Sequence, residues 1–112
     1  MRVHHLAFRT RDLTRLERFY TDALGLSIAR RDGERSVWLR AGGTTLMLEQ
    51  AEDAEPEVAQ GSKDLVAFGI EAEDVDRWRR VLEANAIAIE GETAFTLYFR
   101  DPDGRRIGLS HY

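Results

Sequence analysis

Two titratable side chains in this sequence, His5 and Glu49, occupy positions from which they could take part in chemistry. Because histidine changes charge near neutral pH, His5 could hydrogen-bond a ligand or act as a general base. Glu49 could act as an acid, a base or a cation-binding carboxylate. An acid–base pair requires both groups within hydrogen-bond reach of one substrate atom. In the structural alternatives, His5 is an imidazole satisfied by a backbone carbonyl, and Glu49 is the first charge of an acidic connecting segment.

Further polar and aromatic side chains could bind a ligand without reacting with it. Trp38 is a flat side chain with a polar edge, which suits stacking on a planar molecule. Arg40 follows two residues later and therefore shares its strand face. Ser110 has no evident His and Asp partners, so we expect a hydrogen-bonding group at most. Residues 101–104, Asp-Pro-Asp-Gly, are typical of a turn, and we interpret them as structural.

The composition excludes several kinds of site and partner. The 112 residues include no cysteine, which excludes disulfides, thiolate zinc sites and thiol catalysis. The net charge of −4, without a basic block, predicts that neither nucleic acid nor an anionic membrane is a partner. The sequence shows no signal peptide and no membrane-spanning run, so we expect a cytoplasmic protein.

The sequence repeats itself at offsets of 60 to 62 positions. Leu6-Ala7-Phe8 returns as Val66-Ala67-Phe68, and Trp38-Leu39-Arg40 returns as Tyr98-Phe99-Arg100. Such ordered matches predict a duplicated unit of about 50 residues. We therefore expect a first unit at 1–50, an acidic, solvated linker at 51–63 and a second unit at 64–112, all within a single domain.

Each copy has the pattern of a strand, a helix and three further strands. Alternating apolar residues predict strands, and apolar residues three and four apart predict helices capped by Asp12 and Asp74. On the first strand, His4 should point away from the face that His5 occupies. The expected first-unit elements are a strand at 3–8, a helix at 13–24 and strands at 26–31, 36–41 and 44–49. The expected second-unit elements are a strand at 64–71, a helix at 75–86 and strands at 87–90, 94–100 and 105–111.

This duplicated βαβββ pattern resembles the vicinal oxygen chelate (VOC) superfamily, which includes glyoxalase I, bleomycin-resistance proteins, extradiol dioxygenases and fosfomycin-resistance transferases. The resemblance implies an α+β fold in which two units curl their mixed sheets into an open, barrel-like cleft with the helices outside. It also implies a homodimer with a small-molecule ligand in the cleft. The sequences that carry it are His5-Leu6-Ala7-Phe8, Asp12-Leu13, Phe19-Tyr20, Leu24-Gly25-Leu26 and Phe99-Arg100-Asp101-Pro102-Asp103-Gly104.

In the metal-dependent members, the resemblance places ligands of a divalent ion on the first and last strand of each unit. In this sequence those places fall on His5, Met47, Leu65 and Gly108. Only the first is a donor that suits such an ion. Glu49, two residues past Met47, is the neighbour that could replace a lost ligand. We therefore expect no bound metal, with a single divalent ion on His5 and Glu49 as the alternative.

The resulting expectation is a glyoxalase/bleomycin-resistance-like protein that binds a small organic molecule without a metal ion or other cofactor. The alternative is a VOC enzyme: a metal-dependent lyase, isomerase or dioxygenase with displaced ligands, or an acid–base catalyst using His5 and Glu49. A packed interaction module without a cleft is a third reading. Whether any reaction is catalysed stays open at this point. The expected ligand-binding residues are His5, Trp38, Arg40, Met47, Glu49, Leu65, Gly108 and Ser110.

Overall fold

The computed structural model describes all residues, 1–112, as two compact units, Met1–Glu57 and Val58–Tyr112. Each unit contains a four-stranded mixed sheet and one main helix in the order βαβββ. This confirms the predicted α+β class and the duplicated pattern. The boundary lies inside the predicted linker, so residues 51–57 belong to the first unit.

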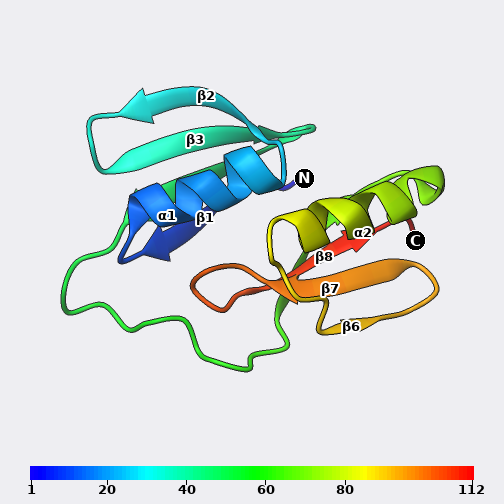
Figure 1. Ribbon diagram of the computed structural model, residues 1–112. Coiled ribbons are helices and arrows are strands. Elements are labelled where there is room, and N and C mark those ends of the chain that lie inside the picture. Colours follow the sequence, from blue (N-terminus) through cyan, green and yellow to red (C-terminus); the bar gives the residue numbers. More distant parts are fainter. The chain divides into compact units, whose positions relative to one another are not determined.

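The first unit pairs its strands in the order β1-β4-β3-β2. β1 runs parallel to β4, whereas β3 is antiparallel to both of its neighbours. Figure 1 shows α1 lying across this sheet. The elements are β1 (His5–Thr10), α1 (Leu13–Arg18), the π-helical turn η1 (Phe19–Ala23), β2 (Ser27–Asp32), β3 (Ser36–Ala41) and β4 (Thr44–Gln50).

The helix of the first unit begins where the sequence predicts but changes its winding halfway. The Asp12 carboxylate accepts a hydrogen bond from the backbone N–H of Arg15 at 3.1 Å, which satisfies one of the free donors of the first turn. From Phe19 onward the winding is π-helical, and the N–H of Leu24 donates to the carbonyl of Phe19. Gly25, at φ +77°, then ends the helix.

One face of the first sheet carries its core. Alternation places Leu46 and Leu48 of β4 beside Leu39 and Val37 of β3, with which they pair directly. These four side chains are fully buried, as are two from the helix, Leu16 and Tyr20. The opposite face of the sheet is consequently the one available for a site.

The second unit repeats this arrangement with the strand order β5-β8-β7-β6. Its core side chains again come from alternate positions of two strands and from the helix, with Phe99, Ile107 and Leu82 fully buried. The elements are β5 (Leu65–Gly69), the 3-10 turn η2 (Ala72–Asp74), α2 (Val75–Ala84), β6 (Gly91–Glu92), β7 (Thr96–Arg100) and β8 (Arg106–Ser110).

Two predictions for this unit are wrong in detail. Asp74 does not cap α2 with its side chain, because η2 leads into the helix and the carboxylate lies 3.6 Å from Arg77 Nη2 instead. The strand expected at 87–90 is replaced by the two-residue β6. Ala86 has φ 56°, and the N–H of Ile87 donates to the carbonyl of Leu82. The C-terminal turn of the helix therefore includes the first residue of the segment that was predicted to be a strand. No helix in the chain is both long and apolar enough to cross a membrane.

Candidate functional site

The face of the first sheet opposite α1 carries all five ligand-binding residues predicted in this unit. Met47 pairs with Trp38 on one side and with Ala7 on the other. Thr45 likewise pairs with His5 and with Arg40. Glu49 lies two residues beyond Met47 and therefore shares its face. The sheet thus brings His5, Trp38, Arg40, Met47 and Glu49 to one surface.

His5 is exposed, and it lies against an aromatic ring and a second imidazole. Its ring centroid is 5.3 Å from that of Trp38. Its Nδ1 is 3.0 Å from Nδ1 of His4, with the two rings edge to face. The expectation that His4 points away is wrong because β1 begins at His5, so strand alternation does not extend to the preceding residue. The nitrogen left for a ligand on His5 is Nε2.

Trp38 and Arg40 are both held by neighbours on β2. The indole Nε1 of Trp38 donates to Asp32 Oδ2 at 2.9 Å, and the guanidinium of Arg30 lies 4.9 Å from the ring centroid. Arg40 Nη1 donates to the carbonyl of Ile28 at 2.8 Å, beside the irregular pairing between Ile28 and Arg30. Trp38 therefore presents a fixed ring on this face, whereas Arg40 is partly engaged with β2.

The structure does not bring His5 and Glu49 together within the first unit. In the β1–β4 register, Glu49 lies opposite Arg9, and His5 lies opposite Thr45. Four residues of strand separate the two positions, a distance of about 13 Å. Glu49 is instead ion-paired with Arg9. An acid–base pair or a shared metal ion made by these two side chains of one unit is therefore ruled out by the register.

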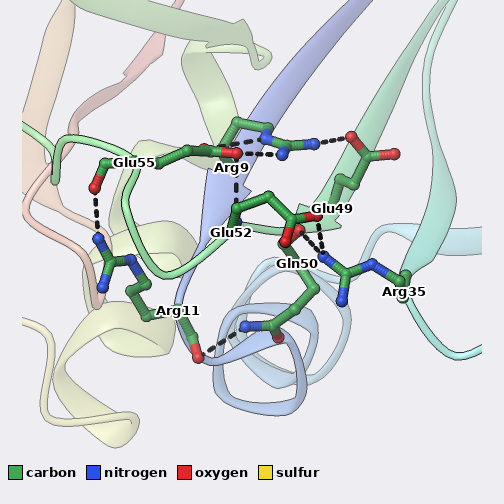
Figure 2. A network of polar contacts seen from close by, with 7 residues as sticks. All are labelled: Arg9, Arg11, Arg35, Glu49, Gln50, Glu52 and Glu55. Carbon is green, nitrogen blue, oxygen red and sulfur yellow. Dashed lines mark hydrogen bonds and ion pairs between the residues drawn. The ribbon is translucent and has the colours of Figure 1, made fainter.

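Arg9 is the centre of a polar network that sequence reasoning missed (Figure 2). Besides Glu49, it binds Glu55: Nε donates to Oε2 at 3.1 Å, and Nη2 pairs with Oε1. Arg11 Nη2 donates to the backbone carbonyl of Glu55, and Arg35 Nη2 donates to Glu52 Oε1 at 3.0 Å. The start of the predicted solvated linker is thus held on the first unit by ion pairs. The sequence did carry a signal for this network, because arginines lie on and next to the first strand and the later segment is rich in acidic residues.

The network lowers the pKa of Glu55 to about 2, chiefly because Arg9 hydrogen-bonds the charged carboxylate. A carboxyl whose pKa is lower in the folded state stabilises that state above its unfolded pKa. This contribution is lost as the pH falls from about 4.5 through about 2. We expect Arg9→Gln to return the Glu55 pKa toward 4.5, measured by carboxyl ¹³C NMR. Arg35→Gln is the matched control, and an equal rise in that variant would contradict the assignment.

On the open face of the second sheet, the predicted residues are apolar or already engaged. The register places Leu65, Gly108 and Tyr98 in neighbouring strands on one face, with Ser110 two residues beyond Gly108. A Cβ at Gly108 would lie 3.2 Å from Thr96 Cγ2 and 3.3 Å from Leu65 Cδ1. Ser110 Oγ is 2.8 Å from Thr96 Oγ1. Gly108, one of the places at which the resemblance implies a metal ligand, is therefore enclosed by methyl groups.

The residues present do not form a complete metal site within either unit. No three His, Asp or Glu side chains gather to hold an ion. The first unit offers the imidazole of His5, which suits a divalent transition metal, while Leu65 and Gly108 offer no donor atom. These positions supply part of a ligand set and no more.

A family model described as "Glyoxalase/Bleomycin resistance protein/Dioxygenase superfamily" matches residues 2–109. The chain belongs to this superfamily. It is 29% identical to the metallothiol transferase FosB of Staphylococcus epidermidis over 113 positions, which cover 96% of this chain and 79% of the relative.

Two solved structures of this fold extend the comparison. A glyoxalase/dioxygenase from Nostoc punctiforme has a TM-score of 0.82 and 26% identity, with 96% of this chain and 88% of that chain covered. The fosfomycin resistance protein FosX of Listeria monocytogenes, complexed with Mn(II) and 1S,2S-dihydroxypropylphosphonic acid, has a TM-score of 0.80. FosX is 16% identical, and the match covers 98% of this chain and 89% of the FosX chain, which shows a shared fold.

These comparisons overturn the expectation of a superfamily member without a cofactor. The relative matched over most of the chain is named a metallothiol transferase, and the FosX structure holds Mn(II). The expectation rested on counting donors at His5, Met47, Leu65 and Gly108. Such a count leaves out water, substrate oxygens and donors from other chains, which complete open catalytic metal sites.

Proposed function

We propose that this protein is a metal-dependent enzyme that acts on a small organic molecule at the open face of the first sheet. The observation that supports this most directly is an exposed imidazole, His5, placed beside the ring of Trp38 on the face that α1 leaves free. Similarity to a metallothiol transferase over 96% of the chain supports thiol transfer as the proposed reaction class. The enzyme would transfer a thiol to a small acceptor.

In this proposal His5 is the chain's first metal ligand and His4 positions it. The 3.0 Å contact between the two Nδ1 atoms would fix the orientation of the His5 ring and direct Nε2 toward the ion. The ion, when bound, would polarise a substrate oxygen. Water, substrate oxygens and donors of a second chain in a homodimer would fill its other positions.

The remaining predicted residues of the first unit would shape the substrate site. Trp38 provides a flat wall that Asp32 and Arg30 hold in place, and Met47, directly beside it, provides an adaptable one. Glu49, paired with Arg9, would bound the polar end of this surface. Leu65, Gly108 and Ser110 stay separate predictions for a ligand on the open face of the second sheet.

Metal binding gives the first test. We expect the apoprotein to bind Mn(II), Ni(II) or Zn(II), and His5→Ala to weaken that binding about 100-fold, since the proposed protein ligand is removed. His4→Ala should weaken it about tenfold, as loss of an orienting partner typically costs 10–100-fold. Isothermal titration calorimetry measures both. His111→Ala, which removes an imidazole from the second unit, is the control and should bind as the wild type does.

Activity gives the second test. The metal-loaded protein is incubated with cysteine or glutathione and with small electrophiles, fosfomycin among them, and adducts are detected by mass spectrometry. We expect adduct formation that requires the ion and is lost in His5→Ala. An apoprotein that binds none of the three ions, or adduct formation equal in wild type and His5→Ala, would show that the proposal is wrong.

A further inference from the structure

An arginine on the open face of the second sheet is held flat with its terminal nitrogens unused. Arg106, in β8, has its guanidinium carbon 4.1 Å from the ring centroid of Tyr98 in β7. Its side chain is 19% exposed, and its Nε lies 3.3 Å from Glu90 Oε1. Neither terminal nitrogen has a hydrogen-bond partner in the chain, and the buried Nε also lacks a well-formed hydrogen bond. Because buried polar groups in proteins normally have hydrogen-bond partners, the unpartnered nitrogens of Arg106 call for an explanation.

The surroundings of Arg106 carry more positive than negative charge. Arg106 lies directly opposite Arg100 in the β7–β8 register, an arrangement of like charges that destabilises a sheet unless an anion compensates it. Glu90 supplies one negative charge, and Arg100 takes most of it through two hydrogen bonds of 2.7 and 2.9 Å. One positive charge, on Arg106, is left without an equal partner.

Arg100 differs from its neighbour in having its nitrogens satisfied. Besides Glu90, its Nη1 donates to the carbonyls of Ser62 at 2.6 Å and Gly104 at 3.2 Å. The capacity to bind something further therefore lies with Arg106 alone. Since a guanidinium has donors in a planar fork, its free edge suits the two oxygens of a carboxylate, phosphate or phosphonate.

We propose that Arg106, stacked on Tyr98, binds the oxyanion group of a small-molecule ligand on the open face of the second sheet. Two neighbours on this face favour a ligand with a short apolar part next to its charged group. Gly108 pairs with Tyr98 and projects no side chain, and Leu65, 41% exposed, pairs with Arg106. The inference goes beyond the proposed function because it concerns the second unit and requires no metal ion.

The test titrates the apoprotein, with EDTA present and ionic strength constant, with methylphosphonate, inorganic phosphate and acetate. Arginine Nε–Hε resonances in ¹H–¹⁵N NMR spectra report binding. We expect saturable shifts of the Arg106 resonance and about tenfold weaker binding, a change of about 1.4 kcal/mol, in Arg106→Gln. Tyr98→Leu should weaken binding severalfold because the guanidinium is no longer held flat.

Two further variants keep the result decisive. Arg80→Gln makes the same charge change at an exposed position of α2 and should leave affinity unchanged. Arg106→Lys keeps the charge and should still bind severalfold more weakly, because an ammonium cannot make the bidentate contact. Affinity that falls equally in Arg80→Gln and Arg106→Gln, or no saturable binding of any of the three anions, would overturn the proposal. Since EDTA removes divalent ions, either outcome leaves the proposed metal-dependent activity to its own test.

Discussion

Replacing Phe99 with alanine should lower the free energy of unfolding by about 3–5 kcal/mol. Phe99 is fully buried in β7, on the side of the sheet that packs against α2, and pairs in register with the fully buried Ile107. Truncation removes apolar area and leaves a cavity that the surrounding side chains fill only in part. Because whole domains are stable by about 5–15 kcal/mol, this is a large fraction of the total.

Urea unfolding followed by circular dichroism measures the loss, and an unchanged denaturant slope shows that the unfolded state is the same. Phe95→Ala makes the same chemical change at a residue that is 45% exposed and whose ring lies edge to face against the rings of His111 and Tyr112. We expect it to cost less than about 1.5 kcal/mol. Equal losses in the two variants would contradict the location of the core.

The second large effect is expected at Asp101, in the turn between β7 and β8. Its carboxylate is fully buried and accepts hydrogen bonds from the backbone N–H groups of Asp103 at 2.9 Å and Arg105 at 3.0 Å. It also pairs with Arg105 Nη1 at 3.1 Å. Asp101→Ala leaves these donors unsatisfied and should cost about 2–4 kcal/mol.

Two variants at this turn separate the contributions. Asp103→Ala removes a carboxylate that pairs with the same Arg105 nitrogen, at 3.0 Å, and should cost only about 1 kcal/mol, since the Asp101 pair remains. Asp101→Asn keeps an oxygen for the backbone donors and should fall between the two. Urea denaturation midpoints compare all three. If Asp101→Ala were no worse than Asp103→Ala, the turn would not depend on the buried carboxylate.

Sequence reasoning succeeded where a repeat, an alternation or a short motif in the chain determines the outcome. The repeat at offsets of 60 to 62 predicted two copies of one βαβββ unit. Alternation along strands predicted that Trp38 shares a face with Arg40 and Met47 with Glu49, and the register agrees. The Asp-Pro-Asp-Gly segment was interpreted as a turn, and the Asp101 carboxylate indeed binds the turn's own backbone. The strand faces and the turn depend on neighbours a few residues apart, and the duplication is visible as a repeat in the sequence itself.

The prediction of an absent cofactor is wrong because the ligands of a metal ion are not all visible in one sequence. It judged one chain by the donors at four positions, and the comparisons with FosB and FosX contradict it. A metal site with open positions takes ligands that no single sequence contains, such as water and substrate.

The sequence by itself determined the class of fold, the duplication and the faces on which side chains lie, because these follow from the repeat at offsets of 60 to 62 and from periods of two and 3.6 residues along the chain. The tertiary structure decided which residues meet. Strand register placed Glu49 opposite Arg9 rather than near His5. The segment that follows β4 brings Glu55 into an ion pair with Arg9. Likewise, pairing of β7 with β8 set Arg106 opposite Arg100. Alternation fixes a face but not a position along the partner strand, so contacts between distant residues depend on the register of the folded sheet.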